Sequence, residues 1–459
     1  MSMLDISAAA HVPTAPSGLS LPAPETLQQL GQRFTWGVAT AAFQIEGANQ
    51  TDGRGESIWD RFCATPGKVR NGDDGSQACD HYRRWPQDVA LMRQLGIDAY
   101  RFSIAWPRVQ ALGHGAWNDK GIAFYDRLID ALLDAGIQPH ATLYHWDLPQ
   151  ALQDEGGWLS RVTVQRFAEY AERMGRLFGD RMHSLATHNE PWCTAVLGHE
   201  TGQFAPGWRD QVAAVQVSHN LLLSHGLALQ ALRAAGVKCP LGIVLNQSSR
   251  SAAKPKDQPA ADLAYAKFVR RFMDPLLLGR YPQLDGFVQP TALEGDMALI
   301  RQPLDFLGIN YYTRLWVSQD GLPPPAELGR TDMGWEIYPD GLRELLVGLQ
   351  REYPLPPIYI MENGMANADQ VVDGQVQDLE RVDYLRRHLQ ALAEAKAEGV
   401  DIRGYFAWSL MDNFEWDSGY AKRFGLVHVD YATQQRTPKA SFDWYRRTAQ
   451  ATRQGAANA

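Results

Sequence analysis

WNDKGIAFYDRLIDALLDAGIQPHATLYH, residues 117–145, contains one complete helix-and-strand unit of a pattern that recurs along the chain. Apolar residues over 122–133 return at helical spacing, with Asn118 in the position of an N-cap and Gly136 as a stop signal. Residues 138–145 then have the apolar, β-branched and aromatic character of a strand. This unit predicts a helix that leads directly into a buried strand.

The same alternation continues from residue 34 to about 447 and predicts a barrel. A second unit, for example, joins a helix face over 164–178 to a strand over 182–189. Candidate strands number eight, at about 35–44, 98–105, 138–145, 182–189, 240–246, 304–310, 357–362 and 402–409. Strands that alternate with helices form parallel sheets, and eight units over this length are typical of a closed (β/α)₈ barrel. An open doubly wound sheet fits less well, because no Gly-x-Gly-x-x-Gly turn follows a strand.

The composition is that of a single folded domain with short ends. The chain has 459 residues, of which 45% are hydrophobic, and this is enough for a sizeable core. We expect a flexible or surface-draped extension over 1–33, which is rich in Ala, Pro and Ser. One barrel domain is expected over 34–447, because no Gly/Ser linker divides it, and a C-terminal tail over 448–459.

Charge and cysteine content exclude several classes of function. The net charge is −8 and the basic residues are dispersed, which argues against nucleic acid or an anionic membrane as partner. Apolar stretches are interrupted before about 18 residues and the first residues lack a signal-peptide pattern, so no membrane span is expected. The four cysteines show no C-x-x-C spacing that would indicate a metal knuckle or a redox motif. We therefore expect a cytoplasmic protein with reduced thiols and no metal or other cofactor.

Two glutamates each end an apolar strand-like run and lead into a turn. Pro191 follows Glu190, and an Asn-Gly pair follows Glu362. Proline cannot donate to a sheet ladder and Asn-Gly favours turns, so both glutamates should lie at strand ends. In a barrel, the C-terminal strand ends form the face on which active sites are built. Two carboxylates on that face are what cleavage of a glycosidic bond requires.

Further polar or aromatic residues lie at or near the ends of the predicted strands. They are Gln44, Arg101, His145, Asn189, Asn246, Asn310, Tyr312 and Trp408. Any one of them alone, such as Asn246 or Arg101, could simply satisfy buried backbone groups. Their joint occurrence at strand ends instead indicates a site.

Several motifs carry a resemblance to a known family. They are FTWGVATAAFQIEG (34–47), YRFSIAWPR (100–108), YHWDLP (144–149), NEP (189–191), GINYY (308–312), ENG (362–364) and WSLMDNFEW (408–416). In this order, the motifs resemble those of the glycoside hydrolase family 1 β-glucosidases, over about 34–445. The resemblance implies a single (β/α)₈ barrel and a retaining β-glucosidase that removes terminal β-D-glucosyl residues. It leaves β-fucosides and β-galactosides as additional candidate substrates.

The same resemblance implies catalytic roles. Glu190 would be the acid/base and Glu362 the nucleophile. Arg101 would lie beneath Glu362 and favour its charge, Tyr312 would donate its hydroxyl to the same carboxylate, and Asn310 would support the pair. Because two nearby carboxylates repel each other, the pKa of one should be raised, and Glu190 should be the protonated one.

A set of side chains is implied to hold the sugar. It consists of Gln44, His145, Asn189, Tyr312, Glu415 and Trp416 for hydroxyl groups, Trp408 as a stacking floor, and Trp335 on the leaving-group side. Glu415 favours neutral over 6-phosphorylated glycosides, since a carboxylate would repel phosphate. Glu rather than Gln at 190 distinguishes the chain from plant thioglucosidases and indicates an O-glycosidase. Expected substrates are small β-glycosides such as cellobiose or aryl β-glucosides, with a role in cellulose degradation.

Three other functions deserve comparison with this interpretation. A metal-dependent hydrolase would use histidines such as His81, His140, His145, His183 and His188, but their spacings include no helical H-x-x-x-H pair. A non-catalytic sugar-binding protein would leave the carboxylates idle. A transglycosylase would transfer the glycosyl group to a sugar acceptor, and the sequence separates it poorly from a hydrolase. The oligomeric state and the leaving-group preference stay open.

Overall fold

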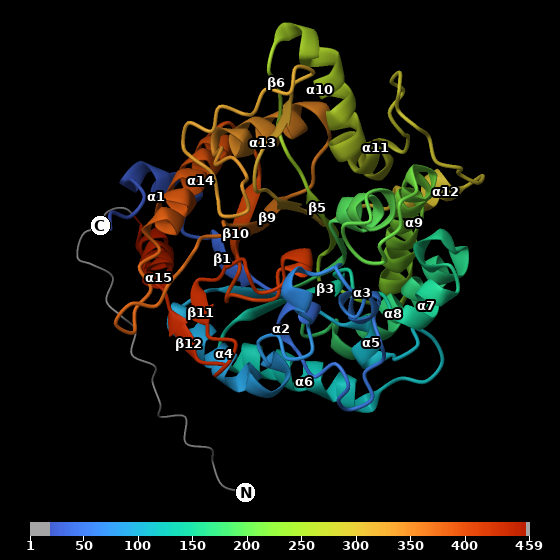
Figure 1. The fold of residues 1–459 in the computed structure, drawn as a ribbon, viewed down its shortest axis with the longest axis horizontal. Coiled ribbons are helices and arrows are strands. Elements are labelled where there is room, and N and C mark those ends of the chain that lie inside the picture. The colour runs from blue at the N-terminus through green and yellow to red at the C-terminus, as the bar shows by residue number, and fades with distance from the viewer. Residues whose placement is uncertain (1–18, 456–459) are drawn as a thin grey trace, which may run out of the picture.

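A computed structural model describes residues 19–455 and contains a closed parallel barrel (Figure 1). The barrel strands are β1 (Thr35–Ala39), β2 (Ala99–Ser103), β3 (Gln138–Tyr144), β4 (Ser184–Asn189), β5 (Leu241–Asn246), β7 (Phe306–Asn310), β9 (Ile358–Asn363) and β10 (Ile402–Trp408). Their order around the barrel is β1-β10-β9-β7-β5-β4-β3-β2, and every pair is parallel. The predicted (β/α)₈ fold is confirmed. The first strand is shorter than predicted, because residues 42–45 form a short helix.

Helices surround the strands on the outside of the barrel, as Figure 1 shows. The longer ones are α4 (His81–Leu95), α6 (Asp119–Asp134), α8 (Arg161–Phe178), α9 (Gln211–Ala234), α10 (Gln258–Tyr265), α11 (Arg271–Leu278), α13 (Asp340–Glu352), α14 (Leu379–Ala397) and α15 (Ala440–Gln454). Shorter ones are α1 (Pro24–Leu30), α2 (Ala42–Ile45), α3 (Ile58–Cys63), α5 (Trp106–Val109), α7 (Gln150–Asp154) and α12 (Asp296–Ile300). Single 3₁₀ turns are η1 (Arg70–Gly72), η2 (Gly157–Leu159), η4 (Pro255–Asp257) and η6 (Trp416–Ser418), and π-helical segments are η3 (Cys193–Glu200) and η5 (Ala266–Arg270).

The unit formed by α6 and β3 shows how the local sequence produces the repeat. Asn118 occupies the N-cap position of α6, but its side-chain amide donates to the carbonyls of Asp52 and Arg108, each at 2.8 Å, rather than capping the helix. Two residues beyond the end of α6, Gly136 takes a left-handed φ of 73°. Glycine adopts this conformation without a steric penalty, so the chain turns there and enters β3.

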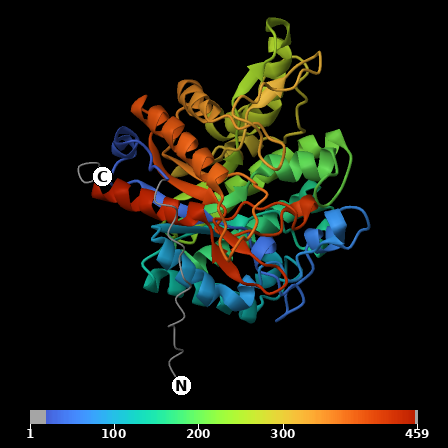
Figure 2. The same cartoon turned by 60° about the vertical axis from the view of Figure 1, so that its left-hand side comes forward.

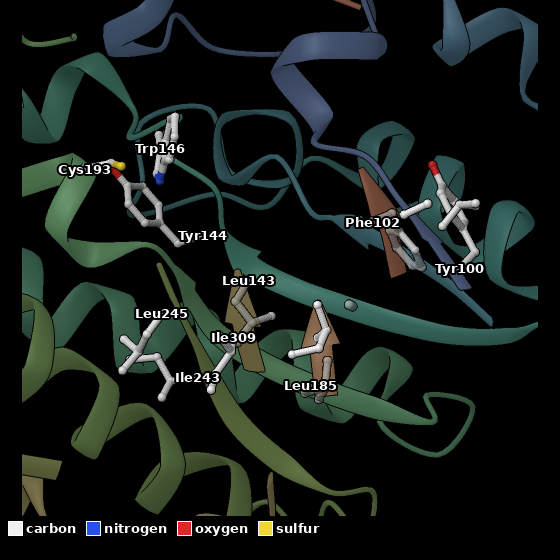
Figure 3. Packing of buried hydrophobic residues seen from close by; sticks show 14 of the residues in the cluster. Tyr100, Phe102, Leu143, Tyr144, Trp146, Leu185, Cys193, Ile243, Leu245 and Ile309 are labelled. Carbon is white, nitrogen blue, oxygen red and sulfur yellow. The ribbon is translucent and has the colours of Figure 1, made fainter. Parts of the chain in front are cut away.

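Strand side chains fill a continuous core between the barrel and its helices. Leu143, Leu185, Ile243, Leu245 and Ile309 come from β3, β4, β5 and β7 and belong to one buried cluster (Figure 3). Burying each such side chain contributes about 1.5–3 kcal/mol as an upper estimate. The strands are therefore held in register by packing, and the polar residues at their C-terminal ends are held with them.

Both ends of the barrel domain extend beyond the predicted boundaries. Within the expected 1–33 extension, α1 buries Leu27 and Leu30 and lies against α14 and α15, as Figures 1 and 2 show. The expected 448–459 tail begins inside α15, which continues to Gln454 and buries Thr452. These apolar contacts, made with distant helices, explain why composition alone placed the boundaries differently. Residues 1–18 and 456–459 of the two segments lie outside the described residues.

Helix α9 is long and apolar enough by composition to cross a membrane. In the folded chain, however, 83% of its apolar window is buried inside the protein. It packs along α8 and against η3. Core packing therefore accounts for its apolar residues.

Loops at the C-terminal ends of the strands carry two small additional sheets. Strands β6 (Arg250–Ala252) and β8 (Leu315–Val317) pair in parallel, whereas β11 (Val427–Val429) and β12 (Arg436–Pro438) pair antiparallel. The segment with β6 and α10 projects from the barrel in Figures 1 and 2. The loops that follow β5, β7 and β10 are thus partly ordered by their own hydrogen bonds.

A buried cluster of charges fixes the loop after β10 to the outer helices. The ammonium group of Lys439, at the start of α15, contacts Asp369 at 2.5 Å and Asp412 at 2.6 Å, and all three side chains are fully buried. Arg423 contacts Asp412 at 2.7 Å, and Arg381 of α14 contacts Asp369 at 2.7 Å. Buried charges are stable only when they are paired, so each member depends on the others.

Lys439→Met should therefore destabilise the protein by about 3 kcal/mol or more, because two buried carboxylates lose a shared cation. The change is measured as a lower thermal unfolding midpoint and a lower denaturant midpoint. Lys254→Met is the control, since Lys254 forms an exposed pair with Asp320 and its loss should change stability by less than about 1 kcal/mol. Equal, small effects of both substitutions would contradict the expected dependence on the buried cluster.

Candidate active site

A cavity of about 480 Å³ lies at the C-terminal ends of the barrel strands and contains both predicted glutamates. Other predicted residues that line it are His145, Asn310, Tyr312, Trp335, Trp408, Glu415 and Trp416. The remaining three, Gln44, Arg101 and Asn189, are fully buried and contact Glu415, Glu362 and His145, respectively. The structure thus brings every residue predicted for the site into one place.

Glu362 lies on β9, is buried, and has a strong partner for each carboxylate oxygen. Arg101 donates from Nη1 to Oε1 at 2.6 Å, and the Tyr312 hydroxyl donates to Oε2 at 2.7 Å. Burial raises the pKa of Glu362, while the charge of Arg101 and the hydrogen bond from Tyr312 oppose that rise. Direct contact with a guanidinium makes Glu362 the carboxyl group that carries the negative charge.

Glu190 follows β4, is buried, and has only uncharged donors. The side-chain amide of Asn310 donates to Oε1 at 2.6 Å, and the thiol of Cys193 donates to Oε2 at 3.0 Å. Burial, and then the negative charge of Glu362, raise the pKa of Glu190 to about 7. Without a cation in contact, Glu190 is the carboxyl group that holds a proton near neutral pH.

Arg101 and Asn310 join the two glutamates through Asn189. The Asn189 side-chain carbonyl accepts from Arg101 Nη2 at 2.6 Å and from Asn310 Nδ2 at 3.0 Å. Its amide group in turn lies 3.1 Å from Nε2 of His145. Burial lowers the pKa of His145 well below its usual range, so the imidazole is neutral and accepts this hydrogen bond.

Gln44 and Glu415 form a second polar group of the site. The Gln44 amide donates to the Phe414 carbonyl at 2.8 Å and to Glu415 at 3.5 Å. Within residues 19–455 its Oε1 has no hydrogen-bond partner, which leaves this acceptor for a ligand hydroxyl. Burial, and then the charge of Asp417, raise the pKa of Glu415 to about 8.

Aromatic side chains form much of the cavity surface. Trp408 and Trp416 each lie with their ring centroid 6.0 Å from that of His145 and with nearly parallel planes. Trp335 packs against Tyr312 at 5.4 Å. Such faces suit the apolar C–H surface of a sugar ring.

Three residues of this region have a strained backbone. Trp146, Glu190 and Trp416 have left-handed φ values of 80°, 47° and 46°. Non-glycine residues in this conformation cost on the order of 1–3 kcal/mol each. The surroundings compensate: the Glu190 amide, for example, donates to the Val244 carbonyl of β5 at 2.9 Å.

Sequence reasoning did not find several residues of the cavity. Trp146 donates from its indole to the Asn189 carbonyl at 2.8 Å, and its ring packs against that of Trp416 in a tilted arrangement with a centroid distance of 4.5 Å. Cys193 and Phe268 reach the cavity from the π-helical segments η3 and η5. Cys193 and Trp146 had local signals, because Cys193 lies three residues after Glu190 and Trp146 directly follows His145 in the YHWDLP motif, whereas Phe268 had none.

A larger hollow of about 650 Å³ lies apart from the glutamates, between the 325–340 loop and α14. Its arginines are already paired: Arg386 and Arg387 with Asp383, and Arg314 with Glu336. It offers no carboxyl pair comparable to Glu190 and Glu362.

The histidines considered for a metal site have separate partners. His81 contacts Asp88, His140 contacts Ser184, and His188 contacts Ser224. Among residues 19–455, no group of three His, Cys, Asp or Glu side chains is arranged to hold an ion.

The arrangement provides the parts for acid-assisted displacement at a sugar carbon. One carboxylate is charged and held by two donors, and a second carboxyl group is protonated near neutral pH in the same cavity. Polar groups for hydroxyls and aromatic faces for a ring surround them. These are the components that glycoside cleavage uses.

Comparisons with known proteins agree with this chemistry. The family model described as Glycosyl hydrolase family 1 matches residues 26–454. "Beta-glucosidase A" of Acetivibrio thermocellus is 45% identical over 434 residues, covering 90% of this chain and 96% of that protein. "Bifunctional beta-D-glucosidase/beta-D-fucosidase" of Bifidobacterium breve is 46% identical, with 90% and 96% covered. The solved structure of the β-glucosidase from Thermotoga maritima in complex with glucoimidazole has a TM-score of 0.89 and 45% identity, covering 91% of this chain and 98% of that one.

Neutralising Glu362 should lower the pKa of Glu190, because the negative charge of Glu362 is one of the causes that raise it. In Glu362→Gln we expect a fall of about one unit from about 7, and the fall is partial because burial, the larger cause, persists. Titration by ¹³C NMR of labelled glutamate measures it, with the Glu190 signal assigned by its loss in Glu190→Gln.

Glu172→Gln, on the exposed face of α8, is the control and should leave the titration unchanged. An unchanged or higher pKa of Glu190 in Glu362→Gln would show that the two carboxyl groups are not electrostatically linked.

Proposed function

Because this chain belongs to glycosyl hydrolase family 1, we propose that it is a retaining β-glucosidase that hydrolyses terminal, non-reducing β-D-glucosyl residues. The observation that carries the proposal is the contrast between the two buried carboxyl groups. Arg101 and Tyr312 hold Glu362 as an anion, while Glu190 has a pKa of about 7. Nucleophile and acid are thus distinguished by their surroundings.

In the first step, a carboxylate oxygen of Glu362 attacks the anomeric carbon and forms a glycosyl ester. The bond from that carbon to the leaving oxygen breaks, and the proton of Glu190 passes to this oxygen. Arg101 and Tyr312 orient the attacking carboxylate, and they keep it ionised despite its burial. Protonation matters because a sugar alkoxide is a poor leaving group.

In the second step, water replaces the leaving group and attacks the same carbon. Glu190, now ionised, takes a proton from the water, and the ester bond to Glu362 breaks to restore the carboxylate. An esterified Glu362 carries no charge, so one cause of the raised pKa of Glu190 disappears during this step. The acid therefore becomes a base without any change of fold.

We propose that the sugar is held by the buried polar group around Gln44 and Glu415 and stacks on Trp408. The unpartnered Oε1 of Gln44 and the carboxyl group of Glu415 supply contacts for hydroxyls. A neutral ring suits this region better than a phosphorylated one, since carboxyl groups surround it. β-Fucosides are additional candidate substrates, supported by the bifunctional relative of Bifidobacterium breve.

The leaving-group side is proposed to be the outer part of the cavity. Trp335, Phe268 and Asn246 line it. This mixture of aromatic and amide surface suits either a second glucose, as in cellobiose, or an aryl group. A cytoplasmic location and a role in cellulose degradation stay predictions from the sequence. The free thiol state of all four cysteines is what a reducing compartment maintains.

Glu362→Ala should reduce turnover of a chromogenic aryl β-glucoside by at least about 10³-fold, because the attacking carboxylate is lost. In the wild type, ¹H NMR during the first turnovers should detect β-glucose before mutarotation, since two displacements retain configuration. Glu172→Ala is the control and should match the wild type. Undiminished turnover in Glu362→Ala would remove Glu362 as nucleophile, and first-formed α-glucose would exclude retention.

Glu190→Ala should affect substrates according to the leaving group. With cellobiose, whose leaving oxygen needs a proton, kcat/KM should fall by about 10²–10⁴-fold. With 2,4-dinitrophenyl β-glucoside, whose leaving group departs as an anion, the loss of kcat/KM should be far smaller. Equal losses on both substrates would contradict the role of Glu190 as general acid.

A further inference from the structure

The thiol of Cys193 contacts Glu190, and the mechanism above assigns it no role. Cys193 is the first residue of η3, three positions after Glu190, and its side chain is buried at the cavity wall. Its Sγ lies 3.0 Å from Glu190 Oε2, and its backbone amide donates to the Glu190 carbonyl at 2.9 Å. Figure 3 shows Cys193 at the edge of the buried cluster that includes Tyr144 and Trp146.

The other oxygen of Glu190 has a donor of a different kind. Asn310 presents its NH₂ group both to Glu190 Oε1 and to the carbonyl of Asn189, which Arg101 also contacts. This NH₂ group can only donate, so Oε1 stays an acceptor in both protonation states. When Glu190 is protonated, its proton therefore belongs on Oε2, beside Cys193.

A thiol suits this position because it both donates and accepts weakly. Beside an ionised Glu190, the S–H group donates to Oε2. Beside a protonated Glu190, it can rotate away and leave the Oε2 proton for the leaving oxygen. Burial and the neighbouring charge of Glu190 raise the pKa of Cys193 well above its usual range, so the sulfur keeps its own proton.

Asn246, the last residue of β5, contacts the same sulfur. Its Nδ2 lies 3.7 Å from the sulfur, within the range of an N–H donor to sulfur. With this donor on one side of Sγ, the S–H bond is directed toward Glu190. The three side chains thus form a chain of donors from β5 through η3 to Glu190.

We propose that Cys193, oriented by Asn246, is a positioning residue that fixes Oε2 of Glu190 and stabilises the carboxylate form of this glutamate. The inference rests on the proposed function, because it assigns the thiol a part in the proton cycle of Glu190. A weak donor stabilises the base of the second step only slightly. Glu190 thereby stays a competent acid for the first step.

The test is the pH dependence of kcat/KM for phenyl β-glucoside. Its leaving group, phenol, is a poor one and needs a proton from Glu190 as it departs. The alkaline limb reports loss of the proton from Glu190 in the free enzyme. Removing a donor to the carboxylate raises the pKa of Glu190, so in Cys193→Ala the limb should move upward by about 0.5–1 unit. Cys193→Val should shift the alkaline limb by the same amount. Because valine is closer in size to cysteine than alanine is, this variant replaces Cys193→Ala in the test if the alanine variant unfolds. Cys193→Ser, with a stronger donor, should keep the limb at or below the wild-type position.

Asn246 supplies the second arm of the test. Asn246→Ala should move the limb upward by less than Cys193→Ala, and the double variant should move it no further than Cys193→Ala alone, because both act through one thiol. Cys239→Ala is the matched control. Cys239 is also a free thiol, but it precedes β5, at the end of the strand opposite Asn246, and the limb should stay in place.

A limb that stays at the wild-type position or moves downward in both Cys193→Ala and Cys193→Val would overturn the inference, even if activity fell, because packing alone would explain such a loss. Wild-type enzyme without turnover of any β-glucoside would instead contradict the proposed function. The two failures are therefore distinguishable.

Discussion

The buried guanidinium of Arg101 is the interaction on which the rest of the site depends. From β2 it donates to Glu362 on β9, to Asn189 on β4 and to Thr142 on β3. Its side chain is 2% exposed and that of Glu362 is 4% exposed, and a buried charge costs several kcal/mol unless it is paired. Arg101 therefore requires Glu362 to be ionised and requires the strands to be in register. The closure of the barrel and the charge state of the site therefore depend on the same contacts of Arg101.

The contacts of Arg101 also set the behaviour of Glu190. Glu190 and Glu362 both line the cavity, but Arg101 contacts only Glu362 directly. Glu190 is left with donors from an amide and a thiol, which stabilise an anion less than a guanidinium does. It therefore remains protonated until Glu362 loses its charge. The contacts that stabilise the free enzyme with Glu362 ionised and Glu190 protonated thus also allow Glu190 to change from acid to base in the proposed mechanism.

The sequence was sufficient where the signals are local. Apolar runs that end at a proline or an Asn-Gly pair located the strand ends, and hence Glu190 and Glu362, within one residue. It was insufficient where position depends on distant contacts. Phe268 reaches the site through a π-helical turn, which has no sequence pattern. Trp146 lies in the YHWDLP motif, but its left-handed backbone and its bond to the Asn189 carbonyl could not be inferred from that motif. The two-turn helix α1 was missed for the same reason, since its apolar face is explained only by α14 and α15. The side chain of Asn118, at a cap position, likewise donates to the distant carbonyl of Asp52 instead of capping the helix.

The carboxyl group of Glu415 affects the charge of the side of the cavity that is proposed to hold the sugar. Its loop is fixed to α15 by the buried contact between Asp412 and Lys439 at 2.6 Å. No cation contacts Glu415 among the ion pairs of residues 19–455, and burial with the nearby acidic groups raises its pKa to about 8. Four carboxyl groups line the cavity, those of Glu190, Glu362, Glu415 and Asp417, and among the ion pairs of residues 19–455 only that of Glu362 contacts a cation, so the negative charge is best stabilised there. A protonated Glu415 both donates and accepts hydrogen bonds, as a hydroxyl group does. The cavity is consequently matched to an uncharged, hydroxyl-rich ligand. An added phosphate would meet the anion of Glu362, while Arg314, which lines the cavity, is already paired with Glu336.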